Sequence, residues 1–267
     1  MILRALGYEG QARQASCTEL FDLLIEVGAV VCCFRHTCSE VNSVLYACKM
    51  ALAEADSSRI AYGAAFHHFS RLRFTPADLE LEMAMLDKNI EKLGIRIEEK
   101  PEYITKYQVD ESRLQGNLEA LGSYPPGKER ARIHDVDCLS AVFRLRKGQS
   151  YYHIEECHSL FVTPNSSVCK MNTKFFVEGN YVAHGSVPIA VTDYALTNIL
   201  WLKKPMRAPN LPRKYVIAEC YAAMEPGDRL WHKYLSKINQ LKERGDITDD
   251  EYYLLRETQL ARTELTG

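Results

Sequence analysis

The sequence lacks several patterns that would assign it to a common class of protein. Its nine cysteines include no Cys-x-x-Cys pair, so a zinc ribbon is not expected. It contains no Gly-x-Gly-x-x-Gly, no complete P-loop and no Gly-x-Ser-x-Gly motif, which leaves little support for a small-molecule α/β enzyme. A cysteine–histidine nucleophile would have to use Cys38 or the pair Cys157-His158. Residues adjacent in sequence rarely face one another, so this class of enzyme has little support.

Long apolar runs and a surplus of positive charge are also absent. No stretch approaches the ~18 apolar residues that a transmembrane helix needs, so we expect no membrane partner. The first ten residues do not resemble a signal peptide, and cysteines within apolar runs such as residues 29–34 are typical of reduced thiols in the cytoplasm. The net charge of −2 does not decide the class by itself: proteins that coat nucleic acid are usually basic overall, whereas a nuclease needs only a local basic patch.

Helical and strand-like segments alternate along most of the chain. Short apolar runs predict strands at residues 29–34, 159–165 and 187–193, and alternating apolar and charged residues predict an edge strand at residues 95–99. Apolar periodicity predicts helices at residues 17–28, 36–56, 75–94, 109–122, 131–148 and 194–204. This order predicts an α/β domain over residues 1–204, with three layers, a mainly parallel sheet and inserted helices at about residues 57–125. Residues 205–267 are predicted to form a helical extension.

Polar residues at the predicted strand ends are candidates for a metal site. Asn165 and Asp193 end two strands, Glu40 follows another by six residues, and Asp135 and Asp137 lie near the start of a helix. Functional groups gather at the carboxyl ends of parallel strands, and Mg²⁺ prefers oxygen ligands of this kind.

Each of these residues also has an ordinary structural interpretation. Asp193 is placed to cap a helix, and Asn165 suits a turn. Asp135 and Asp137 complement a helix dipole, and Glu40 suits a solvated helix face. Their joint arrangement therefore carries more weight than any one of them.

The order of these segments over residues 1–204 resembles the PIN and PIN-like metal-dependent nucleases. Three quoted stretches carry the resemblance: FRHTCSEV, ARIHDVDCLSAVFRLR and LFVTPN. The resemblance implies that Glu40 is the helix glutamate, Asp135 the later aspartate with Asp137 as a neighbouring substitute, Asn165 the last ligand and Asp193 a further acidic residue. It implies Mg²⁺ or Mn²⁺ as cofactor and phosphodiester hydrolysis, with RNA favoured over DNA, in a cytoplasmic toxin or defence protein.

Four further side chains are candidates for contact with the nucleic acid. They are His36, Thr163, Arg71 and Arg73. The two arginines suit the phosphate backbone, and His36 suits a single phosphate. The alternative interpretations are a structural histidine and a solvated arginine face.

Two departures from the family pattern affect the expected activity. The aspartate that ends the family's first strand is absent, so we expect that the chain starts downstream of that strand and that the nuclease is inactive or impaired in this form. Asn165 replaces the usual aspartate and should weaken metal binding. The competing hypothesis is a non-catalytic PIN-like scaffold that binds an inhibitory or partner protein through the aromatics of the C-terminal helices, Tyr221, Trp231, Tyr234, Tyr252 and Tyr253.

Overall fold

The computed structural model describes residues 1–53, 63–121, 124, 129–203, 239–240 and 242–245. Within these residues the protein is mostly helical, with a few short parallel strands, which is consistent with the α/β class. No described helix has the length and apolar character needed to cross a bilayer. The aromatics expected in the C-terminal extension lie outside the described residues, and so does the start of the expected insertion.

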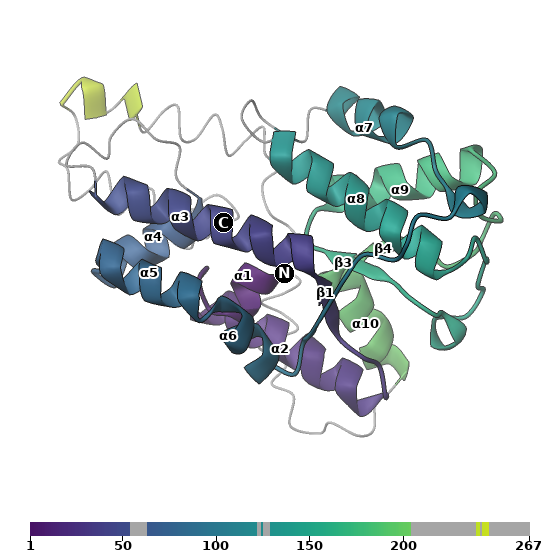
Figure 1. The fold of residues 1–267 in the computed structure, drawn as a ribbon, viewed down its shortest axis with the longest axis horizontal. Helices are drawn as coiled ribbons and strands as arrows, with labels where there is room; N and C mark the ends of the chain where they lie inside the picture. The colour runs from purple at the N-terminus through teal and green to yellow at the C-terminus, as the bar shows by residue number, and fades with distance from the viewer. Residues whose placement is uncertain (54–62, 122–123, 125–128, 204–238, 241, 246–267) are drawn as a thin grey trace.

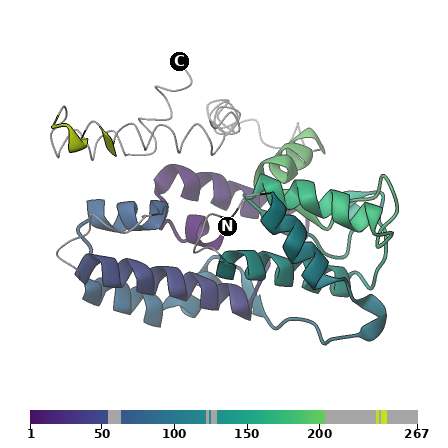
Figure 2. The ribbon, with the colours of Figure 1, turned by 90° about the horizontal axis from the view of Figure 1, so that it is seen from above.

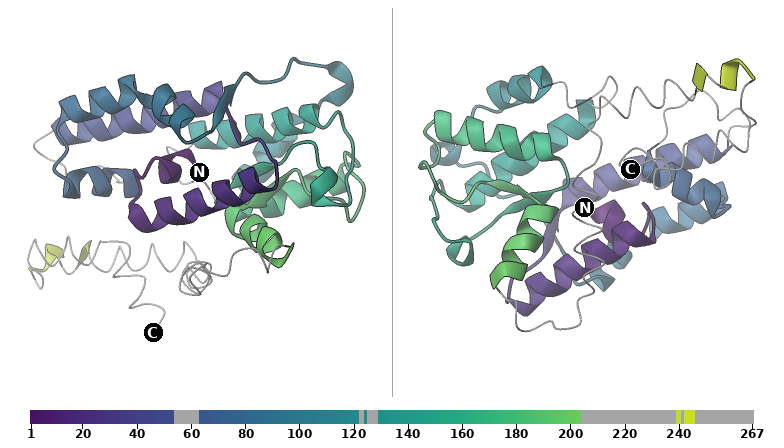
Figure 3. Two further views of the ribbon diagram at one scale, coloured as in Figure 1. Left: turned by 90° about the horizontal axis from the view of Figure 1, so that it is seen from below. Right: turned by 180° about the vertical axis from the view of Figure 1, so that it is seen from behind.

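The elements follow the chain in this order: α1 (Ile2–Ala5), α2 (Gln11–Glu26), β1 (Cys32–Phe34), α3 (Arg35–Ala53), α4 (Ala64–Arg71), α5 (Pro76–Ala84), α6 (Leu86–Lys92), β2 (Arg96–Glu98), η2 (Thr105–Tyr107), α7 (Glu111–Ala120), α8 (Glu129–Leu145), η3 (Ile154–Glu156), β3 (Phe161–Thr163), α9 (Ser166–Glu178), β4 (Ala190–Thr192) and α10 (Asp193–Lys203). Helices α3, α4 and α5 lie on one side of the strands and α7, α8 and α9 on the other (Figure 1). The same division is visible from above (Figure 2) and from behind (Figure 3).

The strands form two parallel pairs. Cys33 in β1 pairs with Ile97 in β2, and Val162 in β3 pairs with Val191 in β4. The single mainly parallel sheet predicted from the sequence is therefore not found among the described residues. Each strand is only three residues long, shorter than the run from which it was predicted.

Two hydrophobic clusters meet at these strands. The first cluster is built around Leu20, Leu45 and Phe69, and it includes Cys33 of β1 and Val191 of β4. The second cluster is built by α7, α8 and α9 and contains Ala190 of β4, while Phe34 of β1 packs against it. Both strand pairs thus contribute to both clusters, and the residues that follow β1 and β3 lie where the two halves of the molecule join.

Local sequence signals explain several element ends. The helix predicted over residues 17–28 was expected to end at a glycine, and this is confirmed. Gly28 follows α2 with a φ of 80°, which favours glycine. Thr75 and Asp78 form a reciprocal capping box at the start of α5. The helix predicted over residues 75–94 is interrupted at Met85, where the backbone bends (φ −97°, ψ 2°) between α5 and α6.

Candidate functional site

Two acidic side chains from distant elements contact the same nitrogen of one histidine ring. Glu40 lies in α3, which follows β1 directly, and His134 and Asp135 lie in α8. The Nδ1 atom of His134 is 3.3 Å from Oε2 of Glu40 and 3.5 Å from Oδ1 of Asp135. Asp135 and His134 are mostly buried, with side-chain exposures of 14% and 12%, while Glu40 is 34% exposed. The two carboxylates predicted as metal ligands are therefore neighbours at the junction between the two halves.

Tyr124 links Asp135 to the third predicted ligand. Its hydroxyl donates a hydrogen bond of 2.5 Å to Oδ2 of Asp135, and the amide nitrogen of Asn165 donates to the same hydroxyl at 3.4 Å. Burial, followed by the nearby charges of Asp135 and Glu40, raises the pKa of Tyr124 above its usual value. Tyr124 therefore stays a neutral phenol that donates its hydrogen bond to Asp135.

The side-chain oxygen of Asn165 is committed to a helix. It accepts hydrogen bonds from the backbone N–H groups of Ser167 (3.2 Å) and Val168 (3.4 Å), which makes Asn165 the N-cap of α9. Thr163 is buried, and its hydroxyl accepts a hydrogen bond from the Asn165 backbone at 3.2 Å. Asn165 thus presents its amide nitrogen, and not its oxygen, to Tyr124.

The other predicted acidic residues have basic partners. Lys100 donates a 2.7 Å hydrogen bond to Asp137, and Arg4 donates one of 3.0 Å to Asp193. Burial, with the charges of Asp193 and Asp135 acting in the same direction, raises the pKa of the Cys169 thiol to about 12.

The predicted arginine contacts lie elsewhere. Arg71 is the last residue of α4, and Arg73 follows it in a left-handed backbone conformation (φ 57°). Both residues are exposed. Helix α4 lies beside the part of α3 that is remote from β1 and thus from Glu40 (Figure 1). The structure does not bring these arginines to the carboxylates.

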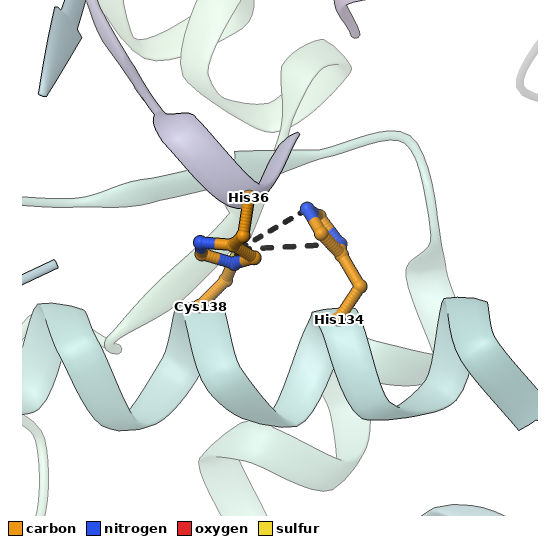
Figure 4. A group of neighbouring side chains, drawn as sticks. All are labelled: His36, His134 and Cys138. Atoms are coloured by element: carbon orange, nitrogen blue, oxygen red, sulfur yellow. Dashed lines mark hydrogen bonds between the residues drawn. The ribbon is translucent and has the colours of Figure 1, made fainter. Parts of the chain in front are cut away.

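A second group of side chains shares His134. His36 approaches from the start of α3, and His134 and Cys138 project from α8 one turn apart (Figure 4). The Cys138 sulfur lies 3.4 Å from Nε2 of His36 and 3.6 Å from Nε2 of His134. Thr37 adds its hydroxyl oxygen, 2.9 Å from Nε2 of His134.

Burial dominates the acid–base properties of this group. It lowers the pKa of His36 to about 4, and the neighbouring His134 and Lys100 act in the same direction. It also raises the pKa of Cys138 well above that of an ordinary thiol, with Asp135 and Glu40 adding to the effect. His36 is therefore neutral at pH 7, and Cys138 is a protonated thiol.

Sequence reasoning found Glu40, Asp135 and Asn165 but missed Tyr124, His134 and Cys138. His134 and Cys138 are four residues apart on a predicted helix, a spacing that places two side chains on one face. The sequence therefore contained a signal that could have identified His134 and Cys138 as a pair. No pattern in the sequence pointed to Tyr124, which lies in a segment rich in proline and glycine.

The chemistry of the site follows from its donors. Two carboxylates and a phenol hydroxyl offer oxygen ligands on one side of His134, and a thiol and a second imidazole offer sulfur and nitrogen on the other. Comparison with protein-family models, with curated proteins and with solved structures finds no match to this chain.

Proposed function

We propose that this chain is a metal-dependent phosphodiester hydrolase that cleaves nucleic acid, with RNA favoured over DNA. The observation that carries the proposal is the convergence of Glu40 and Asp135 on His134, although they come from different halves of the chain. The preference for RNA, and a role as a toxin or defence protein, rest on the resemblance to PIN-like nucleases alone.

The donor set fits Mg²⁺ or Mn²⁺. Hard divalent cations prefer carboxylate oxygens, and Glu40 and Asp135 place such oxygens at one ring nitrogen, Nδ1 of His134. A bound divalent ion would lower the pKa of a water molecule and neutralise charge that develops at phosphorus. Asp193, which directly follows β4, would extend this acidic region if Arg4 released it.

Neighbouring residues would hold the carboxylates in position. Tyr124 donates to one oxygen of Asp135 and leaves the other directed at His134. Asn165 donates to the Tyr124 hydroxyl and is itself fixed by its role as the cap of α9. This chain of hydrogen bonds restricts the rotation of Asp135, and fixed ligands are what metal-assisted hydrolysis requires.

The proposed fold is the three-layer arrangement of PIN-like nucleases. Its support is the parallel direction of both strand pairs and the position of helices on both sides of them. In such a sheet the segments after β1, β3 and β4 would share one edge, and they carry Glu40, Asn165 and Asp193.

Cleavage of labelled single-stranded RNA and DNA in Mn²⁺ tests this function. We expect Glu40→Gln and Asp135→Asn each to slow cleavage by about 100-fold or more, the scale on which loss of one electrostatic stabiliser slows an enzyme. Glu80→Gln is the matched control, because Glu80 is an exposed carboxylate that pairs with Lys49 on another surface. Full activity in both site variants would overturn the proposal.

A further inference from the structure

The cluster of His36, His134 and Cys138 has the dimensions of a metal site. One ligand atom from each residue lies within 4.8 Å of the others. In a tetrahedral zinc site, bonds of about 2.0 Å to nitrogen and 2.3 Å to sulfur separate neighbouring donors by about 3.3–3.6 Å. The sulfur of Cys138 lies 3.4 Å from His36 Nε2 and 3.6 Å from His134 Nε2, so two of the three edges already have this length.

The cluster also has the outer support that metal-binding histidines use. A ligating imidazole usually donates its other N–H to a carboxylate, which fixes the tautomer and the ring orientation. His134 has a carboxylate partner of this kind, because its Nδ1 lies 3.3 Å from Glu40 and 3.5 Å from Asp135, while the Cys138 sulfur is nearer to Nε2 (3.6 Å) than to Nδ1 (4.0 Å). The Thr37 hydroxyl oxygen lies 2.9 Å from Nε2 of the same ring.

The type of donor selects the class of ion. Two imidazoles and one thiolate are ligands for zinc and related d-block ions, whereas Mg²⁺ prefers oxygen alone. We propose that His36, His134 and Cys138 bind such an ion, with Zn²⁺ the best match, at a site distinct from the carboxylate pair. Three protein ligands leave one position of the tetrahedron for water or another small ligand.

Binding requires one change of protonation. Cys138 releases its thiol proton to solvent, and both imidazoles coordinate through a neutral nitrogen, so no oxidant or reductant is needed. His36 is held in place by stacking on Phe34, with ring centroids 5.5 Å apart. The three residues come from two elements that the hydrophobic core already fixes, so the site is formed before the ion arrives.

Cobalt substitution tests this site in the full chain. The protein is freed of metal with a chelator under reducing conditions and titrated with Co²⁺. A thiolate-to-cobalt charge-transfer band that saturates at one equivalent, and that Zn²⁺ abolishes, is the expected result. The band requires a thiolate, so an ion held by Glu40 and Asp135 does not produce it, and failure of the nuclease proposal leaves this test unaffected.

Variants assign the band to these residues. Cys138→Ser and His36→Gln should each remove it, with folding verified by circular dichroism, while Cys169→Ser keeps it. Cys169 is the matched control because it is a partly buried thiol in the neighbouring helix α9. Glu40→Gln should keep the band but weaken Co²⁺ affinity by about 10-fold or more, the typical effect of losing an outer-shell partner. No band in the unmodified chain, or a band that survives Cys138→Ser, would overturn the proposal.

Discussion

Burial changes the ionisation of His68, a histidine outside the candidate site. His68, on α4, has a buried Nδ1 atom without a hydrogen-bond partner among the described residues. Burial lowers the pKa of this ring below the usual 6.5, and the adjacent positive charge of Arg71 acts in the same direction. The folded state therefore binds a proton at His68 less readily than the unfolded chain does.

This difference in pKa predicts that the protein loses stability at acidic pH. When the folded pKa lies below the unfolded one, the unfolded state takes up more protons as the pH falls below about 6.5, so stability is lost there. We expect the urea midpoint to fall between pH 7.5 and pH 5.5, and to fall less in His68→Gln. An equal fall of the urea midpoint in the unmodified chain and in His68→Gln would contradict the assignment to His68.

Individual residues of the candidate site were only partly predictable. The position of a residue after a predicted strand was enough to select Glu40 and Asn165, because strand ends share an edge. The same rule could not show that Asn165 uses its oxygen to cap α9. Nor could it find Tyr124, because that position depends on the tertiary fold and not on any local period.

At the level of elements, buried polar groups connect the strands to α8. Arg146 follows α8 and is only 1% exposed. Its guanidinium donates to the carbonyl oxygens of Ser159 (2.6 Å), Val187 (2.8 Å) and Pro188 (2.8 Å). These carbonyls belong to the segments that lead into β3 and β4, so one side chain positions both strands of that pair.

Removing the Arg146 side chain should lower the free energy of unfolding. Arg146→Met leaves three carbonyl groups without their donor, and each unsatisfied buried group costs about 1–3 kcal/mol, so we expect a loss of roughly 3 kcal/mol or more. Arg146→Lys should recover only part of it, because an ammonium lacks the planar fork of donors. Urea unfolding measures both, with the exposed Arg130→Met as control. A loss below 1 kcal/mol in Arg146→Met would contradict this role.

The elements themselves were predicted unevenly. The helices α3, α7, α8 and α10 and all four strands were placed by their apolar patterns, within a few residues. Helix α9 was missed, although Val168, Met171 and Phe175 recur with helical spacing and are buried. The parallel direction was predicted, but the division into two pairs was not, because three-residue strands hold too little sequence to specify their neighbours.

At the level of the whole molecule, the first helices of the chain and α10 come together. Helix α10 packs against α2, and Arg4 of α1 pairs with Asp193 at the start of α10, 189 residues away. The two side chains remain 27% and 23% exposed. Apolar packing, and not this ion pair, should therefore supply most of the stability of the contact.

A double-mutant cycle with Arg4→Met and Asp193→Asn tests that expectation. We expect a coupling free energy of about 0.2–1 kcal/mol, because solvent screens a partly exposed pair and ordering two side chains costs entropy. The more exposed pair of Lys49 and Glu80 provides the comparison. Coupling above about 2 kcal/mol, beyond the range of exposed pairs, would show that the ion pair itself holds α10 in place.

One imidazole, that of His134, contacts both the carboxylate of Glu40 and the sulfur of Cys138. An ion that fixes the ring on the sulfur side also sets its hydrogen bonds on the carboxylate side. Thermodynamic linkage then requires that each ion changes the affinity of the other by the same factor. The occupancy of each site would then depend on the concentrations of both ions. A low concentration of zinc would change how much manganese or magnesium is bound, and the reverse.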